Sequence, residues 1–354
     1  MKINNRSIGI SKEPYIIAEM SNNHNGSWKR ACELLNIAKK AGVDAVKIQT
    51  YTAESLTINC DKSDFVIFDK LWRGKTYYDL YNEISMPLDW NKKLFNYAEK
   101  IGITIFSSPF DEESIDLLES LNTPAYKIAS FESKDWDFIK IIAKTKKPII
   151  LSTGLSTMSE VSDTVKYIEK LDRHYISDKK LALLQCTSSY PTPNEDANLY
   201  AISELRKEFN LPVGYSDHTE GSDAIEIAIS LGATIIEKHF TDTRLDKNFR
   251  DHKVSLSLDE VNIFLEKAKK IKTILGRSEK FLTNSELEAG HHISFRRSIY
   301  ALSDIDIGSL LTEKNLTYLR PDIGISAMNY EKLLGKTAIK DIKKGCLISE
   351  KDFQ

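Results

Sequence analysis

The chain alternates between short runs of apolar, β-rich residues and longer stretches in which apolar residues recur every three or four positions. The short runs predict eight strands, at residues 15–20, 44–50, 103–108, 124–130, 148–153, 181–186, 212–217 and 233–239. The stretches between them have helical spacing, as in 28–42, where the apolar residues fall on one face. A second predicted helix, 87–102, opens with a proline and ends with a glycine, as helices often do. The pattern therefore predicts a repeated strand–helix unit.

Strict alternation of strands and helices predicts parallel strands, because each helix must return the chain to the same end of the sheet. Eight such units match the number and size of a closed (β/α)8 TIM barrel, an α/β fold. A doubly wound open sheet is the alternative, but no GxGxxG follows any strand, so the usual dinucleotide-binding loop is missing. In either fold, the polar residues at the carboxyl ends of the strands meet at one rim, where ligands bind.

After residue 275 the pattern changes to a polar connector and then to short strands punctuated by glycines. The stretch DIDIGSLLTEKNL (304–316) recurs loosely as DIKKGCLISEKDF (341–353), which indicates a small pseudo-symmetric β-rich module. We therefore predict a barrel domain at 1–278, a linker at 279–294 and the module at 295–354. The segment 51–86 is longer than an ordinary strand–helix loop and carries aromatic residues, so we expect it to select the substrate.

Composition and charge exclude several classes of protein. The 354 residues are 41% hydrophobic and 28% charged, which is typical of a globular domain, and the net charge of -2 provides no basic field for nucleic acid or an anionic membrane. No signal peptide or apolar membrane span is visible. The four cysteines are far apart and form no CxxC, which fits a reducing compartment rather than a disulfide framework or a zinc knuckle. We expect a cytoplasmic protein with neither nucleic acid nor membrane as a partner.

Two histidines end adjacent predicted strands, His218 on the seventh and His239 on the eighth. Two imidazoles with open positions for water and substrate suit a divalent metal ion that acts as a Lewis acid. Asp217 and Glu237 stand beside them and are expected to orient the rings. The alternative is that each histidine has only a structural role.

Lys47 and Lys127 lie inside the second and fourth predicted strands. Because a buried lysine is costly without an anion, two of them on one rim indicate a ligand with phosphate and carboxylate groups. The alternative is a pair of structural salt bridges to Glu19 and Glu132, which are also candidates for proton transfer. Hydroxyls that can add neutral donors to an anion, or can simply cap helices, are those of Ser107, Ser130, Thr153, Thr187 and Ser188.

Aromatic residues cluster in the long segment, as Trp72, Tyr77, Tyr78 and Tyr81. They are candidates for a platform that holds a sugar or deoxysugar. The alternative is that they only pack the segment itself.

The motifs AEMSNNHNGS, AVKIQTYTAESLT, FSSPFD, YKIASFE, STG, CTSSYPTP, GYSDHTEG and IEKHF, in this order, resemble the sialic acid synthase family across almost the whole chain. Within the family, LWRGKTYYDLY (71–81) is most similar to the pseudaminic acid synthase branch. The final residues, including LRPDIGIS, resemble the family's antifreeze-like (SAF) domain, a β-clip fold.

The resemblance implies a transferase that condenses phosphoenolpyruvate with an open-chain amino sugar and water. For this branch the sugar is 2,4-diacetamido-2,4,6-trideoxy-L-altrose, and the products are pseudaminic acid and phosphate, released by C–O cleavage. The resemblance also implies that His218 and His239 hold Mn²⁺, Mg²⁺ or Co²⁺ against the aldehyde oxygen, with His239 counted among the catalytic residues.

Further roles carry over position by position. Glu19 resembles the glutamate proposed to activate water, and Glu132 resembles a second catalytic acid that contacts substrate. The implied substrate-binding residues are Lys47, Gln49, Lys127, Ser130, Ser188, Tyr190, Ser216, Asp251 and Arg320. Ser188 is a departure, since sialic-acid members often carry Asn there. Arg320 matches the arginine that the SAF domain sends into the partner's site, which implies a domain-swapped homodimer.

Three other functions compete with this expectation. The first keeps the family and changes the sugar, as an N-acetylneuraminate or legionaminate synthase. The second is a metal-dependent aldolase on the same barrel, which would use pyruvate and release no phosphate. The third is a non-catalytic sugar-binding or ice-binding protein, which only the C-terminal module suggests.

Overall fold

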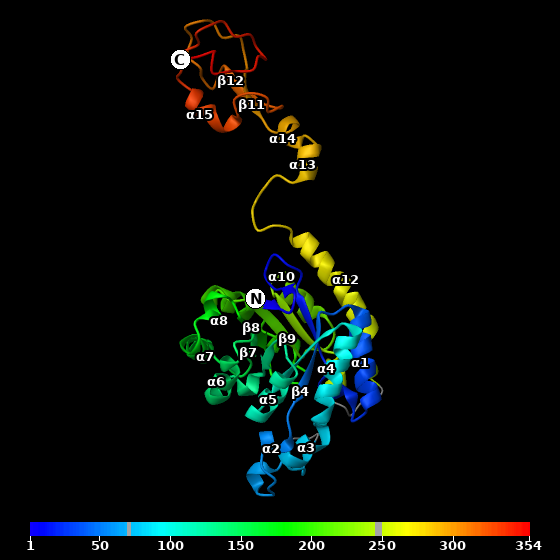
Figure 1. Ribbon diagram of the computed structural model, residues 1–354. Helices are drawn as coiled ribbons and strands as arrows, with labels where there is room; N and C mark the ends of the chain where they lie inside the picture. The colour runs from blue at the N-terminus through cyan, green and yellow to red at the C-terminus, as the bar shows by residue number, and fades with distance from the viewer. Residues whose placement is uncertain (69–71, 245–249) are drawn as a thin grey trace. The chain divides into compact units, whose positions relative to one another are not determined.

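The computed structural model describes the whole chain except residues 69–71 and 245–249 (Figure 1). The chain divides into two compact units, Met1–Gly276 and Arg277–Gln354. Part of the segment 51–86, including Leu71 of the motif LWRGKTYYDLY, lies outside the described residues.

The first unit is a closed barrel of eight parallel strands, in the order β10-β3-β4-β5-β6-β7-β8-β9. The strands are β3 (Tyr15–Glu19), β4 (Ala45–Thr50), β5 (Thr104–Pro109), β6 (Tyr126–Ile128), β7 (Ile149–Ser152), β8 (Leu181–Cys186), β9 (Val213–Asp217) and β10 (Ile235–His239). They coincide with the eight predicted runs to within two residues at each end. The barrel prediction is confirmed, and the open-sheet alternative is wrong.

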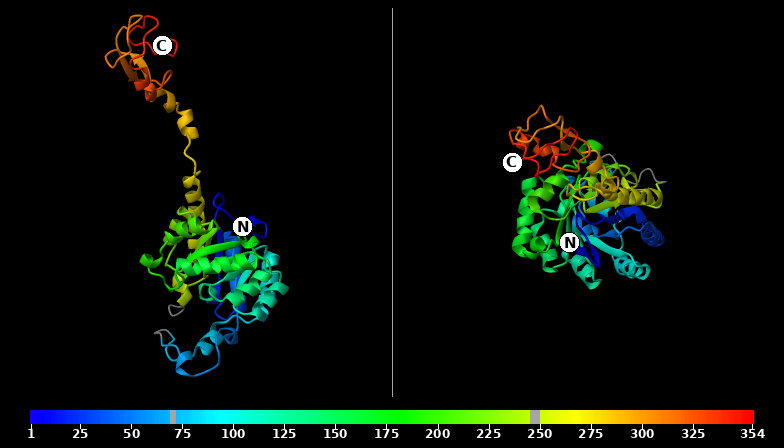
Figure 2. Two further views of the ribbon diagram at one scale, coloured as in Figure 1. Left: turned by 90° about the vertical axis from the view of Figure 1, so that its left-hand side faces the viewer. Right: turned by 90° about the horizontal axis from the view of Figure 1, so that it is seen from above.

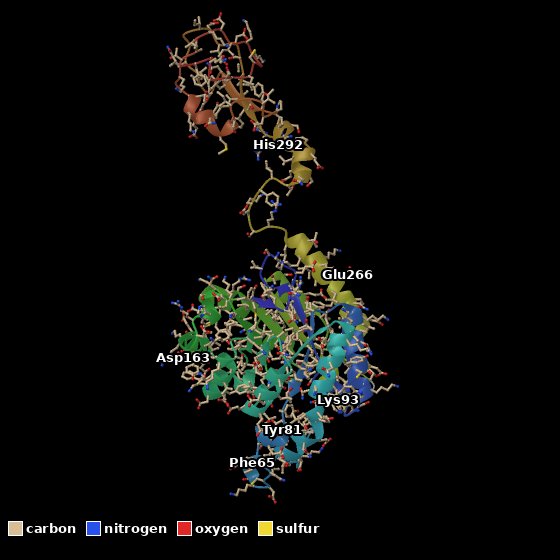
Figure 3. All side chains as sticks on the ribbon, viewed as in Figure 1. Phe65, Tyr81, Lys93, Asp163, Glu266 and His292 are labelled. Atoms are coloured by element: carbon tan, nitrogen blue, oxygen red, sulfur yellow. The ribbon has the colours of Figure 1, made fainter. Side chains whose placement is uncertain are left out.

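Helices surround the barrel (Figure 2). Those between or after strands are α1 (Trp28–Ala41), α4 (Asp89–Ile101), α5 (Glu112–Ser120), α6 (Trp136–Lys144), α7 (Met158–Leu171), α9 (Ala201–Phe209), α10 (Asp223–Ser230) and α12 (Leu258–Leu275). Shorter helices are α2 (Ala53–Leu56), α3 (Tyr77–Ile84), α8 (His174–Ser177) and α11 (Arg250–Val254). Several begin at a side chain that accepts a backbone N–H, as at Ser27, Asp111 and Thr157. The helix ring has a polar outer face, where Lys93, Asp163 and Glu266 are exposed (Figure 3).

Two hydrophobic layers follow from the period-two alternation of side chains along each strand. Outward-facing residues such as Ile16, Val46 and Ile236 pack against the helices. Inward-facing residues such as Ile17 and Phe106 fill the barrel interior together with Ile3 and Ile8, which belong to or follow the hairpin of β1 (Lys2–Ile3) and β2 (Arg6–Ser7).

The hairpin lies at one end of the barrel, and α2 and α3 lie at the other (Figures 1 and 2). The amino end of the interior is therefore closed by apolar side chains. The polar residues that end the strands point into the opposite mouth.

The second unit contains β11 (Ser298–Ala301), β12 (Leu316–Leu319) and the short helices α13 (Asn284–Glu288), α14 (His291–Ser294) and α15 (Tyr330–Leu333). The predicted internal repeat is confirmed. Ile305 and Ile342 occupy equivalent places in the two repeats and exchange both backbone hydrogen bonds, each at 2.8 Å. The turn of each repeat has a glycine with positive φ, Gly308 at 83° and Gly345 at 79°, a conformation that favours glycine. Across the described residues, no helix has both the length and the apolar character needed to cross a membrane.

Candidate active site

A cavity of about 970 Å³ opens at the carboxyl ends of the barrel strands. The predicted catalytic, metal-binding and substrate-binding residues of the first unit all line it: Glu19, Lys47, Gln49, Lys127, Ser130, Glu132, Ser188, Tyr190, Ser216, His218, His239 and Asp251. Arg320 lies in the second unit, directly after β12, where its guanidinium stacks over Phe295 with 5.0 Å to the ring centroid. The strand alternation thus brings together side chains that are far apart in the sequence.

Glu237 on β10 lies between the two buried lysines. Its Oε1 is 3.3 Å from Nζ of Lys47 and 4.0 Å from Nζ of Lys127, and it accepts a hydrogen bond of 3.1 Å from Ser216. Burial opposes ionisation of this carboxyl, but the two ammonium groups outweigh burial and lower the pKa of Glu237 to about 2. Glu237 is therefore an anion that holds two cations on the cavity floor.

Glu19 on β3 is a second partner of Lys47. Its Oε2 is 3.0 Å from Nζ of Lys47, while Oε1 accepts hydrogen bonds from Nε2 of Gln49 at 2.9 Å and from the backbone of Ser21 at 3.1 Å. Burial raises the pKa of Glu19 despite the neighbouring ammonium group. The salt-bridge alternative is thus correct for Lys47 and Glu19. It is wrong for Lys127, whose nearest carboxylate is Glu237 rather than Glu132.

The expectation that Asp217 and Glu237 orient the histidine rings is wrong. Asp217 and Lys238 pair on the outer side of the barrel, with 2.6 Å between Oδ2 and Nζ, and Asp217 also accepts from the backbone of Thr219 at 2.8 Å. This explains how β10 carries three consecutive ionisable residues. Glu237 and His239 face the cavity, while Lys238 faces the opposite way and has its own carboxylate.

Hydroxyl groups gather around the turn after β7. Oγ of Ser130 accepts a hydrogen bond of 3.2 Å from the backbone of Gly154. A Cβ on Gly154 would lie 2.5 Å from Oγ of Ser188 and 2.7 Å from Oγ of Ser130. Ser152 also lines the cavity, and its buried Oγ has no hydrogen-bond partner in the described part of the chain. This serine cradle, formed by Ser130, Ser152, Gly154 and Ser188, is suited to an anion beside Lys127.

Three other candidate hydroxyls turn away from this cradle. Ser107 donates to the carbonyl of Ile48, Thr153 to that of Leu184 and Thr187 to that of Asp196. They satisfy backbone groups and do not line the cavity, so their prediction as anion ligands is wrong.

His218 and His239 face one another with ring centroids 5.4 Å apart. Nδ1 of His218 donates to the carbonyl of Thr187 at 2.9 Å, which leaves the lone pair of Nε2 available to a ligand. Nδ1 of His239 is buried, has no hydrogen-bond partner among the residues that the structure describes, and lies 4.0 Å from Oδ2 of Asp251. Burial lowers the pKa of His239 to about 3, so this ring is neutral.

Neutral imidazoles are the form that binds metal ions. Within the described ranges no cluster of three or more His, Cys, Asp or Glu residues is arranged to hold a metal. The residues therefore fit a cation held by two imidazoles that takes its remaining ligands from substrate and water.

Tyr190 and Asp251 lie beside the histidines, and Glu132 lines the cavity after β6. The ring of Tyr190 lies 3.9 Å from that of His218, and Asp251 accepts a hydrogen bond of 2.6 Å from Ser21. Burial raises the pKa of Glu132 to about 7, and its Oε2 has no partner among the described residues. A carboxyl with this pKa can release or take up a proton near neutral pH.

Aromatic rings form the wall opposite the charged floor. Tyr51 makes edge-to-face contacts with Tyr81 at 6.2 Å and with Phe110 at 5.3 Å, and Tyr77 stacks on Tyr81. Tyr81 lies on α3, at the end of the barrel away from the N-terminus (Figure 3). Of the predicted aromatic platform, Trp72, Tyr77 and Tyr81 line the cavity, whereas the hydroxyl of Tyr78 donates to Glu54 at the surface. We call Tyr51, Tyr81 and Phe110 the aromatic wall.

Sequence reasoning missed His24, Tyr51 and Gly154 as parts of the site. The alternation of side chains along β4 is a signal for Tyr51, because this residue directly follows a strand that carries the cavity residues Lys47 and Gln49. For Gly154, the motif STG gave the position but not the close approach of Ser130 and Ser188. No sequence pattern indicated His24, which lies in the connection after β3.

Comparison with known proteins gives a consistent picture. The NeuB family model matches residues 34–280, and the SAF domain model matches residues 296–354. A pseudaminic acid synthase of Campylobacter jejuni is 42% identical over 356 residues, covering 100% of both chains. An N,N'-diacetyllegionaminic acid synthase of the same species is 37% identical, covering 96% of this chain and 100% of that protein.

A solved structure extends the comparison to the fold. The N-acetylneuraminic acid synthetase of Leptospira borgpetersenii, crystallised with citrate, has a TM-score of 0.72 and 28% identity. The match covers 82% of this chain and 94% of that protein.

Proposed function

Because this chain belongs to the NeuB family, we propose that it condenses phosphoenolpyruvate with 2,4-diacetamido-2,4,6-trideoxy-L-altrose and water to give pseudaminic acid and phosphate. The observation that carries the proposal is the cavity floor, where two buried lysines share one carboxylate next to the facing rings of His218 and His239. The full-length similarity to a pseudaminic acid synthase supports the choice of sugar.

The cavity offers two cationic positions to phosphoenolpyruvate, which carries a phosphate and a carboxylate. Lys127 and the serine cradle provide an ammonium group and several hydroxyls on one side of the floor. Lys47, which also donates to Ser108 at 3.3 Å, provides the second ammonium group. Glu237 is the anionic partner that both lysines share when no substrate is bound, and the substrate anions supply further negative charge when it is bound.

His218 and His239 would hold a divalent cation, Mn²⁺, Mg²⁺ or Co²⁺. When bound, this ion would polarise the aldehyde oxygen of the open-chain sugar. Thr187 fixes the His218 ring through Nδ1, and burial keeps His239 neutral, so both rings are prepared as ligands. Tyr190 packs against His218 and limits access of water to the rings.

The reaction forms a C–C bond between the methylene carbon of phosphoenolpyruvate and the aldehyde carbon. As this bond forms, the π bond of the aldehyde breaks and its oxygen takes up a proton to become a hydroxyl group. Electron density leaves the enol double bond, so the adjacent carbon becomes cationic and adds water. Glu19 or Glu132 accepts a proton from this water, and the tetrahedral intermediate then expels phosphate with the bridging oxygen. Glu132 is the better-matched base, because a pKa of about 7 lies near the working pH.

The aromatic wall supports a deoxysugar. Tyr51 is 4% exposed and its ring contacts both other members of the wall, so this side of the cavity is built of aromatic rings, with the hydroxyls of Tyr51 and Tyr81 as its polar groups. A methyl group, such as that of a 6-deoxysugar, gains free energy on leaving water there. A hydroxymethyl group would bury an oxygen with fewer partners.

The proposal includes two properties of the whole protein. The first is a domain-swapped homodimer in which Arg320 of one chain completes the other chain's site, supported by the match to the SAF domain. The second is a cytoplasmic location, supported by the free thiols of Cys32, Cys60, Cys186 and Cys346.

A panel of amino sugars tests the proposal. The purified protein is incubated with phosphoenolpyruvate, Mn²⁺ and one sugar at a time, and phosphate and nonulosonic acid are measured. We expect the 6-deoxy-L-altrose derivative to be consumed fastest, with one phosphate released per product. Faster consumption of N-acetylmannosamine or of the legionaminate precursor would assign the chain to the N-acetylneuraminate or legionaminate synthases instead. Consumption of pyruvate without phosphate would indicate an aldolase.

A further inference from the structure

His24 is a buried histidine of the cavity wall that the mechanism above does not use. It ends the short 3-10 helix Ser21–His24, which follows β3, and it is 3% exposed. Asn23 anchors this turn, because its side chain donates to the carbonyl of Phe240 at 2.7 Å and to Oγ of Ser255 at 3.0 Å. The imidazole is therefore held in a fixed place at the rim of the barrel.

The backbone determines which ring nitrogen carries the proton. Nδ1 of His24 accepts a hydrogen bond of 3.1 Å from the N–H of Gly26, so Nδ1 has no proton and the neutral ring carries its proton on Nε2. His218 has the opposite arrangement, since its Nδ1 donates to a carbonyl. His218 thus presents a lone pair to the cavity, as a metal ligand must, whereas His24 presents an N–H group.

The ring of His24 is neutral and packed. Burial, assisted by Arg30, lowers the pKa of His24 to about 4. Its ring packs edge-to-face on Trp90 with centroids 5.7 Å apart, and Trp90 packs in the same way on Trp28. Among the described residues, Nε2 has no hydrogen-bond acceptor, and it is not one of the fully buried unpaired atoms. Because His24 lines the cavity, this donor is accessible to a ligand oxygen.

The barrel order indicates which substrate supplies that oxygen. In the closed sequence β10-β3-β4-β5-β6-β7-β8-β9, β3 lies diametrically across from β7. His24 follows β3, whereas Ser152 and Gly154 of the serine cradle lie at the end of β7. His24 is therefore on the far side of the mouth from the anion cradle and adjacent to β10, which carries His239.

We propose that Nε2–H of His24 donates a hydrogen bond to an oxygen of the acceptor sugar, a hydroxyl or an acetamido carbonyl, and thereby positions the sugar beside His239. This inference rests on the proposed function, because it assumes that the cavity binds an oxygen-rich acceptor next to the histidine pair. It assigns His24 to sugar binding rather than to metal or phosphoenolpyruvate binding.

Steady-state kinetics of His24→Phe test this assignment. Phenylalanine keeps a ring against Trp90 but has no N–H, so KM for the sugar should rise about tenfold, the effect of losing one hydrogen bond. KM for phosphoenolpyruvate and the Mn²⁺ concentration for half-maximal activity should stay within about twofold of wild type. His24→Gln, whose side-chain amide provides a donor at a similar reach, should recover most of the loss. His174→Phe, at an exposed histidine of α8, is the matched control.

An unchanged KM for the sugar in His24→Phe, or an equal rise in KM for phosphoenolpyruvate, would overturn the assignment. If His24→Phe does not fold, the wild-type protein labelled with ¹⁵N-histidine decides: adding the sugar should shift the Nε2–H resonance of His24, and an unmoved resonance counts against the proposal. These results are separable from failure of the proposed function, which would appear as a wild-type protein that consumes no amino sugar of the panel.

Discussion

At the scale of single residues, the site is a problem of charge compensation. Lys47 and Lys127 are both nearly inaccessible to water, and burial of an ammonium group is costly without an anion. Glu237 supplies this anion from β10, across the barrel interior, with 3.3 and 4.0 Å to the two Nζ atoms. Burial opposes the charge of both lysines: Glu19 and Glu237 outweigh it and raise the pKa of Lys47, whereas burial lowers the pKa of Lys127 despite Glu237. A substrate with two anionic groups would therefore favour the charged form of Lys127 in particular.

Replacing Glu237 by Gln should destabilise the protein and make its stability depend on anions. Loss of one partner of a buried ion pair costs about 3–5 kcal/mol, so Tm should fall in thermal unfolding. Phosphate added to Glu237→Gln should raise Tm more than it does in wild type, because the ligand then replaces the missing carboxylate. Glu266→Gln, at an exposed position on α12, is the control. An unchanged Tm without phosphate would show that Glu237 does not compensate the lysines.

Glu132 should control the pH dependence of the reaction. Its pKa of about 7 in the folded protein means that the base form is present above pH 7 and is lost as the pH falls. If Glu132 acts as a base, kcat/KM of the wild-type protein should therefore fall below about pH 7. This fall should be absent in Glu132→Gln. A decline above pH 7 that Glu132→Gln removes would assign it the role of an acid instead.

The same group should affect stability in the opposite direction to activity. The folded-state pKa of Glu132, about 7, is higher than its ordinary value of 4.5, so the ionised carboxyl is disfavoured in the folded protein. The resulting loss of stability develops as the pH rises from 4.5 through 7. Glu132→Gln should therefore have a higher Tm than wild type at pH 8, by a margin that shrinks toward pH 4.5. Equal melting temperatures at pH 8 would contradict the burial of this carboxyl.

At the scale of elements, period-two alternation decides which polar residues reach the cavity. Glu237 and His239 face inward while Lys238 faces outward to Asp217, and Ser108 and Ser152 line the cavity while Ser107 and Thr153 do not. The strand ends and their convergence follow from the sequence pattern alone. Pairings such as Glu237 between two lysines do not, because they depend on neighbours contributed by other strands.

The orientation of the histidine rings is the other feature that the sequence does not predict. His24 and His218 are the same residue type on the same rim, but one accepts from the amide of Gly26 and the other donates to the carbonyl of Thr187. These backbone contacts depend on the local path of each connection. These contacts make His24 a hydrogen-bond donor and His218 a candidate metal ligand, a difference that no sequence motif indicates.

The turn after β7 should be sensitive to a single methyl group. In Gly154→Ala the new Cβ would lie 2.5 and 2.7 Å from the hydroxyls of Ser188 and Ser130, so both must move. We expect KM for phosphoenolpyruvate to rise about tenfold or more, with KM for the sugar little changed. Gly9→Ala, where the added Cβ meets nothing within 4 Å, should behave as wild type. A selective rise in KM for the sugar would show that the serine cradle does not bind phosphoenolpyruvate.

At the scale of the whole molecule, the chain combines a barrel unit with a unit of β-rich, pseudo-symmetric architecture. The described residues that line the cavity belong to the barrel unit. The role proposed for the second unit rests on Arg320, which follows β12.

Subunit mixing should reveal a site shared between chains. His239→Ala should be inactive because its barrel is defective. Arg320→Ala should be inactive at low sugar concentration because its SAF domain is defective. A heterodimer of the two has one site with both residues intact, so denaturing and refolding an equal mixture should give about a quarter of wild-type activity. Each variant refolded alone is the control, and no recovery in the mixture would contradict the domain-swapped dimer.

The most direct test of the account follows the bridging oxygen of phosphoenolpyruvate. The protein is supplied with Mn²⁺, the 6-deoxy amino sugar and phosphoenolpyruvate labelled with ¹⁸O between carbon and phosphorus, and the products are analysed by mass spectrometry. The account predicts that the released phosphate carries the label, because water adds to the carbon and the C–O bond breaks. Label retained in the nine-carbon sugar, or turnover without phosphate, would contradict it.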